Sequence, residues 1–254
     1  MTWAHILAAI DSTPAGLHAA KVARELADSA GMKLTVMTVL PQEGTDPAAS
    51  VAAVEPTVTF GIPGIEIVRM ADRLNVDLLV LGRTIYEVKG EPRLGPTADQ
   101  VARRSQVPCL FVPESQDEFG HHMVALDGSE RGYSILEAAR EFFEVTGGDL
   151  HVVTVEPGEN GGGHAEAGAP LSRTLRVAGT LDKMARRNGV PMHYEFRVLR
   201  GEPVPLLSRE LSDPQRDLLV VGSRRGGPAG LSLSTGVGRA LLFSVQCAVL
   251  TVPL

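Results

Sequence analysis

The sequence has few cysteines, no long apolar run and no excess of basic charge, and each shortage excludes a class of protein. With two cysteines and no histidines at ligand spacing, a metal site is not expected, and Cys109 and Cys247 are interpreted as small buried hydrophobes. No apolar run approaches the roughly 20 residues of a membrane span. The net charge of −6 argues against a general nucleic-acid binder, which needs a basic surface.

Three further motifs are missing. The sequence contains no Gly-Lys-Ser/Thr and therefore no P-loop. The first residues have no basic region ahead of the apolar run, so we expect a core strand there, no signal peptide, and a cytoplasmic protein. Ser12 lies beside Asp11 but has no histidine placed by the pattern, which gives nucleophilic catalysis little support.

The chain does contain a long internal repeat. Four segments of the first half recur in the same order in the second half, each an apolar run with similar flanking residues. The pairs are 5–12 with 122–129, 34–41 with 150–157, 77–82 with 217–222, and 108–113 with 247–253. A repeat on this scale predicts two domains, at residues 1–113 and 121–254.

The spacing between repeats changes partway along. Asp11 and Asp127 are 116 residues apart, whereas Gly82 and Gly222 are 140 apart, so the second half holds 24 extra residues. That is the length of one helix with its loops. We therefore expect the N-terminal domain to lack a helix, with no regular helix between Pro41 and Glu55.

The apolar runs are continuous, which is typical of parallel strands buried on both faces. Helical patterns alternate with them at 15–30, 131–146 and 171–188, and the last is expected to turn Leu175, Ala178, Leu181 and Ala185 inward. The predicted fold class is α/β, with two tandem doubly wound, Rossmann-like parallel-sheet domains.

In such sheets ligands bind beyond the carboxyl ends of the strands, where the strand order reverses. Asp11 and Asp127 are predicted to lie there, as are the glycine-bearing loops after the strands that end near Gly82 and Gly222. Each loop leads into a helix whose N-terminus suits a phosphate.

These segments resemble the universal stress protein family in its tandem form. The resemblance covers nearly the whole chain and rests on Asp127-Gly128-Ser129, the segment 218–225, and the Pro-Cys or Cys-Ala closing strands. It implies, in each half, a five-stranded parallel sheet with four helices, of the adenine-nucleotide alpha hydrolase-like kind. It also implies pairing through the last strand, so Cys109 to Val112 should pair antiparallel with Ala248 to Val252.

In nucleotide-binding members of that family, a loop of the form Gly-x-x-Gly, nine residues, then Gly-Ser or Gly-Thr holds ATP phosphates through its backbone. The first half departs from this form. Gly82 and Gly95 keep the spacing, but Ile85 replaces the second glycine and Pro96 replaces the hydroxyl residue. Because Ile85 adds bulk and Pro96 removes an N–H donor, the first site is expected to be degenerate.

The second half departs less. Gly222 is kept, Arg225 replaces the second glycine, and Thr235-Gly236 closes the motif. If the motif is shifted by one residue, Gly226 and Gly236 have the required nine residues between them, and Val237 then stands at the position of the hydroxyl residue. The candidate nucleotide site of this half is Asp127, Gly222, Arg224, Arg225, Gly226, Thr235 and Gly236, and the degenerate site of the first half is Asp11, Gly82 and Gly95.

Simpler interpretations stay open. Asp11 and Asp127 can serve as helix caps as well as nucleoside contacts. Arg224 and Arg225 are as consistent with solvated loop residues as with a phosphate clamp. Residues 226–228 fit an ordinary turn.

Three functions remain as hypotheses. The first is a stress-response binding protein with degenerate nucleotide loops, which recognises a ligand or a partner. The second is an ATP sensor with one live site in the C-terminal domain, and the third is a slow ATP-hydrolysing enzyme. No positioned base or carboxylate pair supports the third. The expected assembly is a pseudo-dimer of the two domains, which could pair further as a homodimer.

Overall fold

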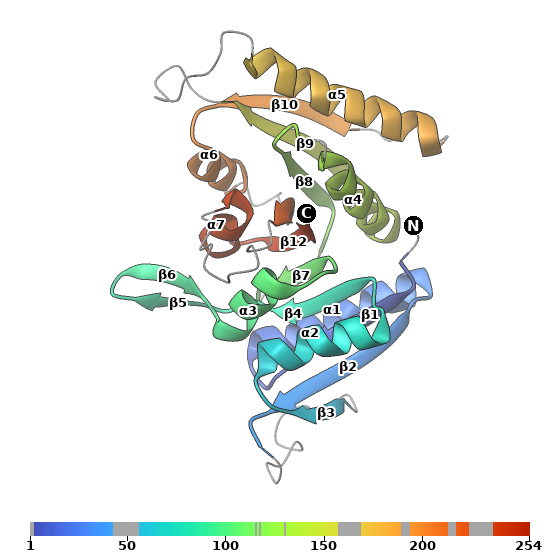
Figure 1. The fold of residues 1–254 in the computed structure, drawn as a ribbon, viewed down its shortest axis with the longest axis vertical. Helices are drawn as coiled ribbons and strands as arrows, with labels where there is room; N and C mark the ends of the chain where they lie inside the picture. Colours follow the sequence, from blue (N-terminus) through green and yellow to red (C-terminus); the bar gives the residue numbers. More distant parts are fainter. Residues whose placement is uncertain are drawn as a thin grey trace.

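The computed structural model describes residues 3–42, 56–114, 116, 118–129, 131–156, 169–188, 194–212, 217–223 and 236–254. Within these residues ten strands form one sheet, and helices cover both of its faces (Figure 1). The fold is α/β with a large and mostly parallel sheet, as the alternation of apolar runs and helical patterns predicted.

The strand order of the sheet is β10-β9-β8-β11-β12-β7-β4-β1-β2-β3. Each half of the chain contributes five parallel strands, and when they are numbered within their own half both sets have the order 3-2-1-4-5. The strands of the first half are β1 (His5–Ala9), β2 (Lys33–Leu40), β3 (Thr57–Phe60), β4 (Leu78–Gly82) and β7 (Cys109–Val112). Those of the second half are β8 (His121–Leu126), β9 (Asp149–Glu156), β10 (Tyr194–Arg200), β11 (Leu218–Ser223) and β12 (Ala248–Pro253). Both halves are therefore doubly wound, with the same strand order.

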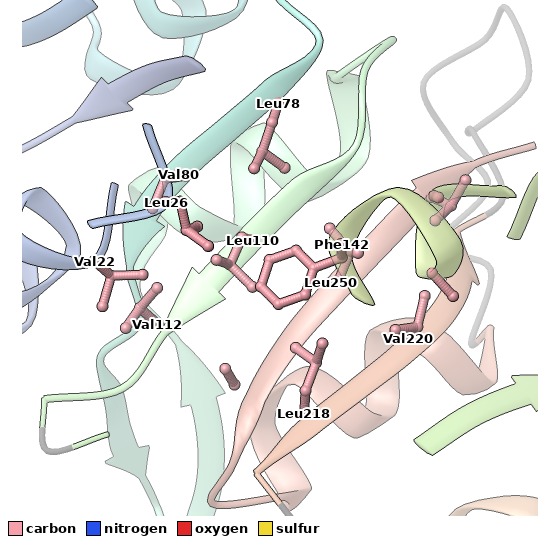
Figure 2. Close-up of a cluster of buried hydrophobic side chains, with 14 of the residues drawn as sticks. Val22, Leu26, Leu78, Val80, Leu110, Val112, Phe142, Leu218, Val220 and Leu250 are labelled. Carbon is pink, nitrogen blue, oxygen red and sulfur yellow. The ribbon is translucent and has the colours of Figure 1, made fainter. Parts of the chain in front are cut away.

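The helices form two layers. Residues of α1 (Pro14–Ala30), α4 (Gly132–Thr146) and α5 (Ala169–Asn188) pack in one core cluster. Residues of α2 (Pro63–Leu74), α3 (Pro96–Arg104), α6 (Pro203–Glu210) and α7 (Val237–Ser244) pack in the other. Alternate residues of each central strand face opposite layers. Leu110 and Leu250 therefore join the first cluster (Figure 2), and Phe111 and Val249 join the second.

The two halves join edge to edge. β7 and β12 pair antiparallel, with Cys109 opposite Thr251, Leu110 opposite Leu250 and Phe111 opposite Val249. The predicted pairing of the closing strands is thus confirmed. It covers two apolar edges and lets both core clusters continue across the junction.

The two cysteines are free and buried. Because Cys109 faces Thr251, four strand positions, about 13 Å, separate it from the point opposite Cys247. Burial raises the pKa of the Cys109 thiol to about 12 and that of Cys247 to about 11.

The extra element of the second half is α5, and its predicted extent is confirmed. Of the residues expected to face inward, Leu181 is buried as predicted and Ala178 is half-buried, but Leu175 is wrong, since its side chain is 65% exposed. Val177 and Met184 are buried as well, and the side chain of Ala185 lies outside the described part. The prediction that the first half has no helix between Pro41 and Glu55 falls mostly on residues 43–55, which lie outside the described residues.

Candidate functional site

The strand order reverses between β1 and β4 in the first half and between β8 and β11 in the second, because these neighbours pair directly. Asp11 follows β1 after one intervening residue, and Asp127 follows β8 immediately. Gly82 ends β4, and Gly222 is the next-to-last residue of β11. These four residues therefore lie at the carboxyl edge, where ligands of doubly wound sheets bind.

Asp11 braces the start of α1. Its Oδ1 accepts hydrogen bonds from the backbone N–H of Thr13, at 3.1 Å, and from the Thr13 hydroxyl. The Thr13 hydroxyl oxygen in turn accepts the N–H of Gly16 at 3.0 Å. The direct cap of α1 is therefore Thr13, and Asp11 holds that cap in position.

Asp127 is arranged differently. Its Oδ1 accepts the N–H of Ser129 at 2.9 Å across a turn in which Gly128 has φ 71°. The N-cap position of α4 is Arg131, which makes no side-chain cap bond. Asp127 is exposed at the edge of the sheet.

The end of β4 lies directly against the first turn of α1. A Cβ at Gly82 would lie 2.5 Å from the carbonyl carbon of Ala15 and 2.6 Å from the N of Gly16. A Cβ at Gly16 would lie 2.2 Å from Asp11 Oδ1. Both glycines are thus required by close backbone packing, which is a structural reason for Gly82 besides any phosphate contact.

The loop after β4 is a hairpin. Strands β5 (Ile85–Val88) and β6 (Glu91–Leu94) pair antiparallel, and Lys89 and Gly90 form the turn with φ 53° and 80°. Figure 1 shows this hairpin projecting beyond α3. Some of its backbone N–H groups pair the two strands, so this stretch is an ordered hairpin.

The ends of the hairpin explain the two departures from the nucleotide motif. Ile85 pairs with Leu94 at the base of the hairpin. Gly95 donates its N–H to the Thr84 carbonyl at 2.9 Å and precedes Pro96, the first residue of α3. Pro fits that position because its fixed φ suits a helix start and its missing N–H costs nothing there.

Arg83 reaches from this loop into the other half of the chain. It is 4% exposed, and its guanidinium donates to the carbonyl oxygens of Leu242 at 3.0 Å and Gln246 at 2.9 Å. These carbonyls lie at the C-terminal end of α7, where a cation is favoured. Burial lowers the pKa of Arg83 to about 10, while the nearby Cys247 acts in the opposite direction, so the side chain stays charged at neutral pH.

In the second half, the described part of the site is Asp127, Gly222 and Gly236. A Cβ at Gly222 would lie 2.6 Å from Leu254 Cδ1 and 2.9 Å from Ile135 Cδ1, so apolar side chains fill that side of the strand end. Gly236 occupies the N-cap position of α7 without a side-chain cap bond.

The remaining candidates of the second half, Arg224, Arg225, Gly226 and Thr235, lie outside the described residues. The geometry therefore brings Asp127 and Gly222 to one edge on adjacent strands, and the arrangement of the intervening loop stays a prediction.

The sequence interpretation missed the hairpin and Arg83. A local signal for the hairpin exists, because the β-favouring run 85–88 is followed by Lys89-Gly90, a turn pair that tolerates positive φ. No local signal marks Arg83, since its acceptors lie 159 and 163 residues away in the chain.

Within the described residues, no group of three or more His, Cys, Asp or Glu could hold a metal ion. None of the helices in that part of the chain combines the length and apolar character needed to cross a membrane.

Comparisons with known proteins agree with the fold. A universal stress protein from Archaeoglobus fulgidus DSM 4304 superposes with a TM-score of 0.70 at 17% identity, covering 98% of each chain. A putative universal stress protein from Pseudomonas aeruginosa UCBPP-PA14 gives a TM-score of 0.70 at 16% identity, covering 99% of this chain and 93% of that one. A search of curated proteins gives no match.

The family model of the universal stress protein family matches this sequence twice, over residues 43–113 and 118–253. These matches fall on the two halves that share one strand order and meet through β7 and β12. The chain therefore belongs to the universal stress protein family.

Proposed function

We propose that this protein is a stress-response binding protein whose ligand site lies in the second half, while the loop of the first half has become part of the junction. One observation supports the proposal above others. The residues that would hold phosphates in the first half are paired as the β5–β6 hairpin, and the adjacent Arg83 is buried against α7.

The ligand class we propose for the second half is an adenine nucleotide. Asp127 is exposed at the switch point, and α7 starts at Val237 after Gly236, an N-cap residue that has no side chain to cap the first N–H groups. Free N–H groups at a helix start suit a phosphate. Arg224, Arg225, Gly226 and Thr235 complete the proposed site, and recognition of another ligand or a partner is the alternative use of the same edge.

We further propose that the protein acts by binding and not by turnover. Ser12 is exposed beside Asp11, and the described residues place no histidine in hydrogen-bond contact with it. General-base activation of a hydroxyl needs such a partner.

Equilibrium dialysis of the full chain with ATP and Mg²⁺ tests this proposal. The halves should not be separated, because cutting the chain would uncover the paired edges of β7 and β12. The matched variants are Asp127→Ala and Asp11→Ala, since the two residues occupy equivalent positions. Loss of one charge-assisted contact at about 1.5–3 kcal/mol should weaken ATP binding at least tenfold for the first variant and leave it unchanged for the second.

Each outcome has a defined meaning. Equal loss in both variants, or loss in Asp11→Ala alone, contradicts the assignment of the site to the second half. Absence of ATP binding by the wild type removes the nucleotide and leaves recognition of another ligand or partner. Release of phosphate from ATP by wild type, at a rate lost in Asp127→Ala, would contradict the binding-only proposal.

A further inference from the structure

A cavity of about 360 Å³ lies where the hairpin of the first half meets the second half. Its walls come from β6 and α3 on one side and from α7 on the other. The volume falls in the range of small-molecule sites, which often lie at the junction of two structural units.

Three arginines line this cavity, and two of them share one carboxylate. Arg103 Nε donates a hydrogen bond to Asp99 Oδ2 at 2.9 Å, and its Nη2 lies 2.7 Å from the same oxygen as an ion pair. Arg239 donates Nε and Nη2 to Asp99 Oδ1 at 3.0 and 2.8 Å. Asp99 therefore holds one guanidinium from each half, with both of its oxygens in use.

The two guanidinium groups keep unused donors. The contacts with Asp99 involve Nε and Nη2 of each arginine, and neither Nη1 of Arg103 nor Nη1 of Arg239 has a hydrogen-bond partner among the described residues. Arg93, on the hairpin, pairs with Glu91 at 2.7 Å at the exposed rim. Three arginines against two carboxylates leave one excess positive charge in the lining.

The rest of the wall is apolar. Phe243 of α7 and Leu94 of β6 both line the cavity, and Leu94 is buried. A guanidinium pair beside an aromatic and an aliphatic side chain offers one region for an anion and another for a flat or apolar group.

We propose that this cavity is a second ligand site, which binds a small organic phosphate across the two halves. The phosphate oxygens accept from the Nη1 groups of Arg103 and Arg239, with Arg93 at the rim, because guanidinium forks match phosphate geometry. The organic part lies against Phe243 and Leu94. Because Arg103 and Arg239 come from different halves, the bound ligand stabilises the junction between them.

Phenyl phosphate is a suitable probe, since it joins a phosphate to an aromatic ring and carries no adenine. Isothermal titration of the full chain should give saturable binding. Arg93→Gln should weaken it about tenfold, as expected for one charged hydrogen bond. Arg93 is the variant of choice because its only ion pair in the described part of the chain is the exposed one with Glu91, so the fold should be retained.

Arg69→Gln is the matched control. Arg69 makes an exposed ion pair with Glu66 at the same 2.7 Å, but it lies on α2 and does not line the cavity. The Arg69→Gln variant should bind phenyl phosphate with the affinity of the wild type. Inorganic phosphate should bind more weakly than phenyl phosphate, because it makes no contact with Phe243.

The proposal is overturned if phenyl phosphate shows no saturable binding at up to about 10 mM, which corresponds to a free energy near −3 kcal/mol. It is also overturned if Arg93→Gln and Arg69→Gln bind equally well. Asp127→Ala should bind phenyl phosphate like the wild type, so failure here and failure of the proposed nucleotide site are separate results.

Discussion

Replacing Arg83 with alanine removes a buried side chain that joins the loop after β4 to the C-terminal end of α7. The change deletes two hydrogen bonds from a charged donor, to Leu242 O at 3.0 Å and Gln246 O at 2.9 Å. It leaves two carbonyl oxygens without that donor in a buried site and creates a cavity. Each unsatisfied acceptor costs about 1–3 kcal/mol, so we expect the free energy of unfolding to fall by about 3–5 kcal/mol.

A second variant separates the hydrogen bonds from the volume. Arg83→Met fills most of the space and avoids a buried charge, but it cannot donate to either carbonyl. Since both acceptors lose their donor, we expect the free energy of unfolding of Arg83→Met to fall by about 2–3 kcal/mol, less than that of Arg83→Ala. If both variants lose the same amount, the hydrogen bonds and not the filled volume hold the junction.

Urea unfolding of the full chain, followed by far-UV circular dichroism, measures these differences through the midpoint and slope of the transition. Arg69→Ala is the control, because it removes an exposed ion pair that contributes no more than about 1 kcal/mol. The argument fails if Arg83→Ala costs less than about 1 kcal/mol, or no more than Arg69→Ala.

Three further predictions concern glycines, the shared carboxylate and the thiols. Gly82→Ala should destabilise the fold by about 1–3 kcal/mol in urea unfolding, because its Cβ would lie 2.5 Å from the Ala15 backbone. Gly95→Ala should stay within about 0.5 kcal/mol of wild type, since its Cβ would be 3.5 Å from the nearest atom; equal effects would contradict the packing argument. Burial would raise the pKa of Asp99, but hydrogen bonds from two arginines hold it below the ordinary 3.8. Its stabilisation is therefore complete above pH 3.8 and is lost as the pH falls through the folded pKa, so unfolding measured against pH should show the gap between wild type and Asp99→Asn closing in acid. Cys109 and Cys247, with pKa values of about 12 and 11, should resist a disulfide reagent at pH 8 until the chain unfolds, and rapid labelling of the native protein would contradict their burial.

The same thiols should make the free energy of unfolding fall as the pH rises above 9. Both pKa values are raised in the folded state above the ordinary 9.0, so the folded chain keeps protons that the unfolded chain releases. Stability is therefore full below pH 9 and falls as the pH rises towards about 11 to 12. Cys109→Ala should reduce this slope in unfolding measurements above pH 9, and an unchanged slope would show that other groups cause it.

The repeated segments, together with the family resemblance, determined the large-scale order of the molecule. Apolar runs with matched flanks gave two sets of strands, and the pairing of β7 with β12 followed from the twinned closing segments together with the family resemblance. The extent of α5 also followed from local pattern and spacing. These features depend on neighbouring residues and on a periodicity that a sequence displays directly.

Only the tertiary structure decided which face of α5 is buried. The expected and observed sets share Leu181 and both have helical spacing, but Leu175 is exposed while Val177 and Met184 are buried, so the buried face is rotated from the expected one. The contacts of α5 with α4 and β9 determine which of its faces is buried, and these contacts involve residues far away in the chain.

The hairpin in the loop after β4 and its contacts with the second half were not predicted, although Ile85 and Pro96 already indicated a departure from the phosphate-binding motif. The spacing of Gly82 and Gly95 matched a phosphate loop, while the Cβ positions show that Gly82 is needed where β4 touches α1. Arg83 finds its acceptors 159 and 163 residues away, and Asp99 joins Arg103 to Arg239 across the junction. Such contacts exist only once β7 and β12 have brought the halves together, because no local pattern encodes a partner at that separation.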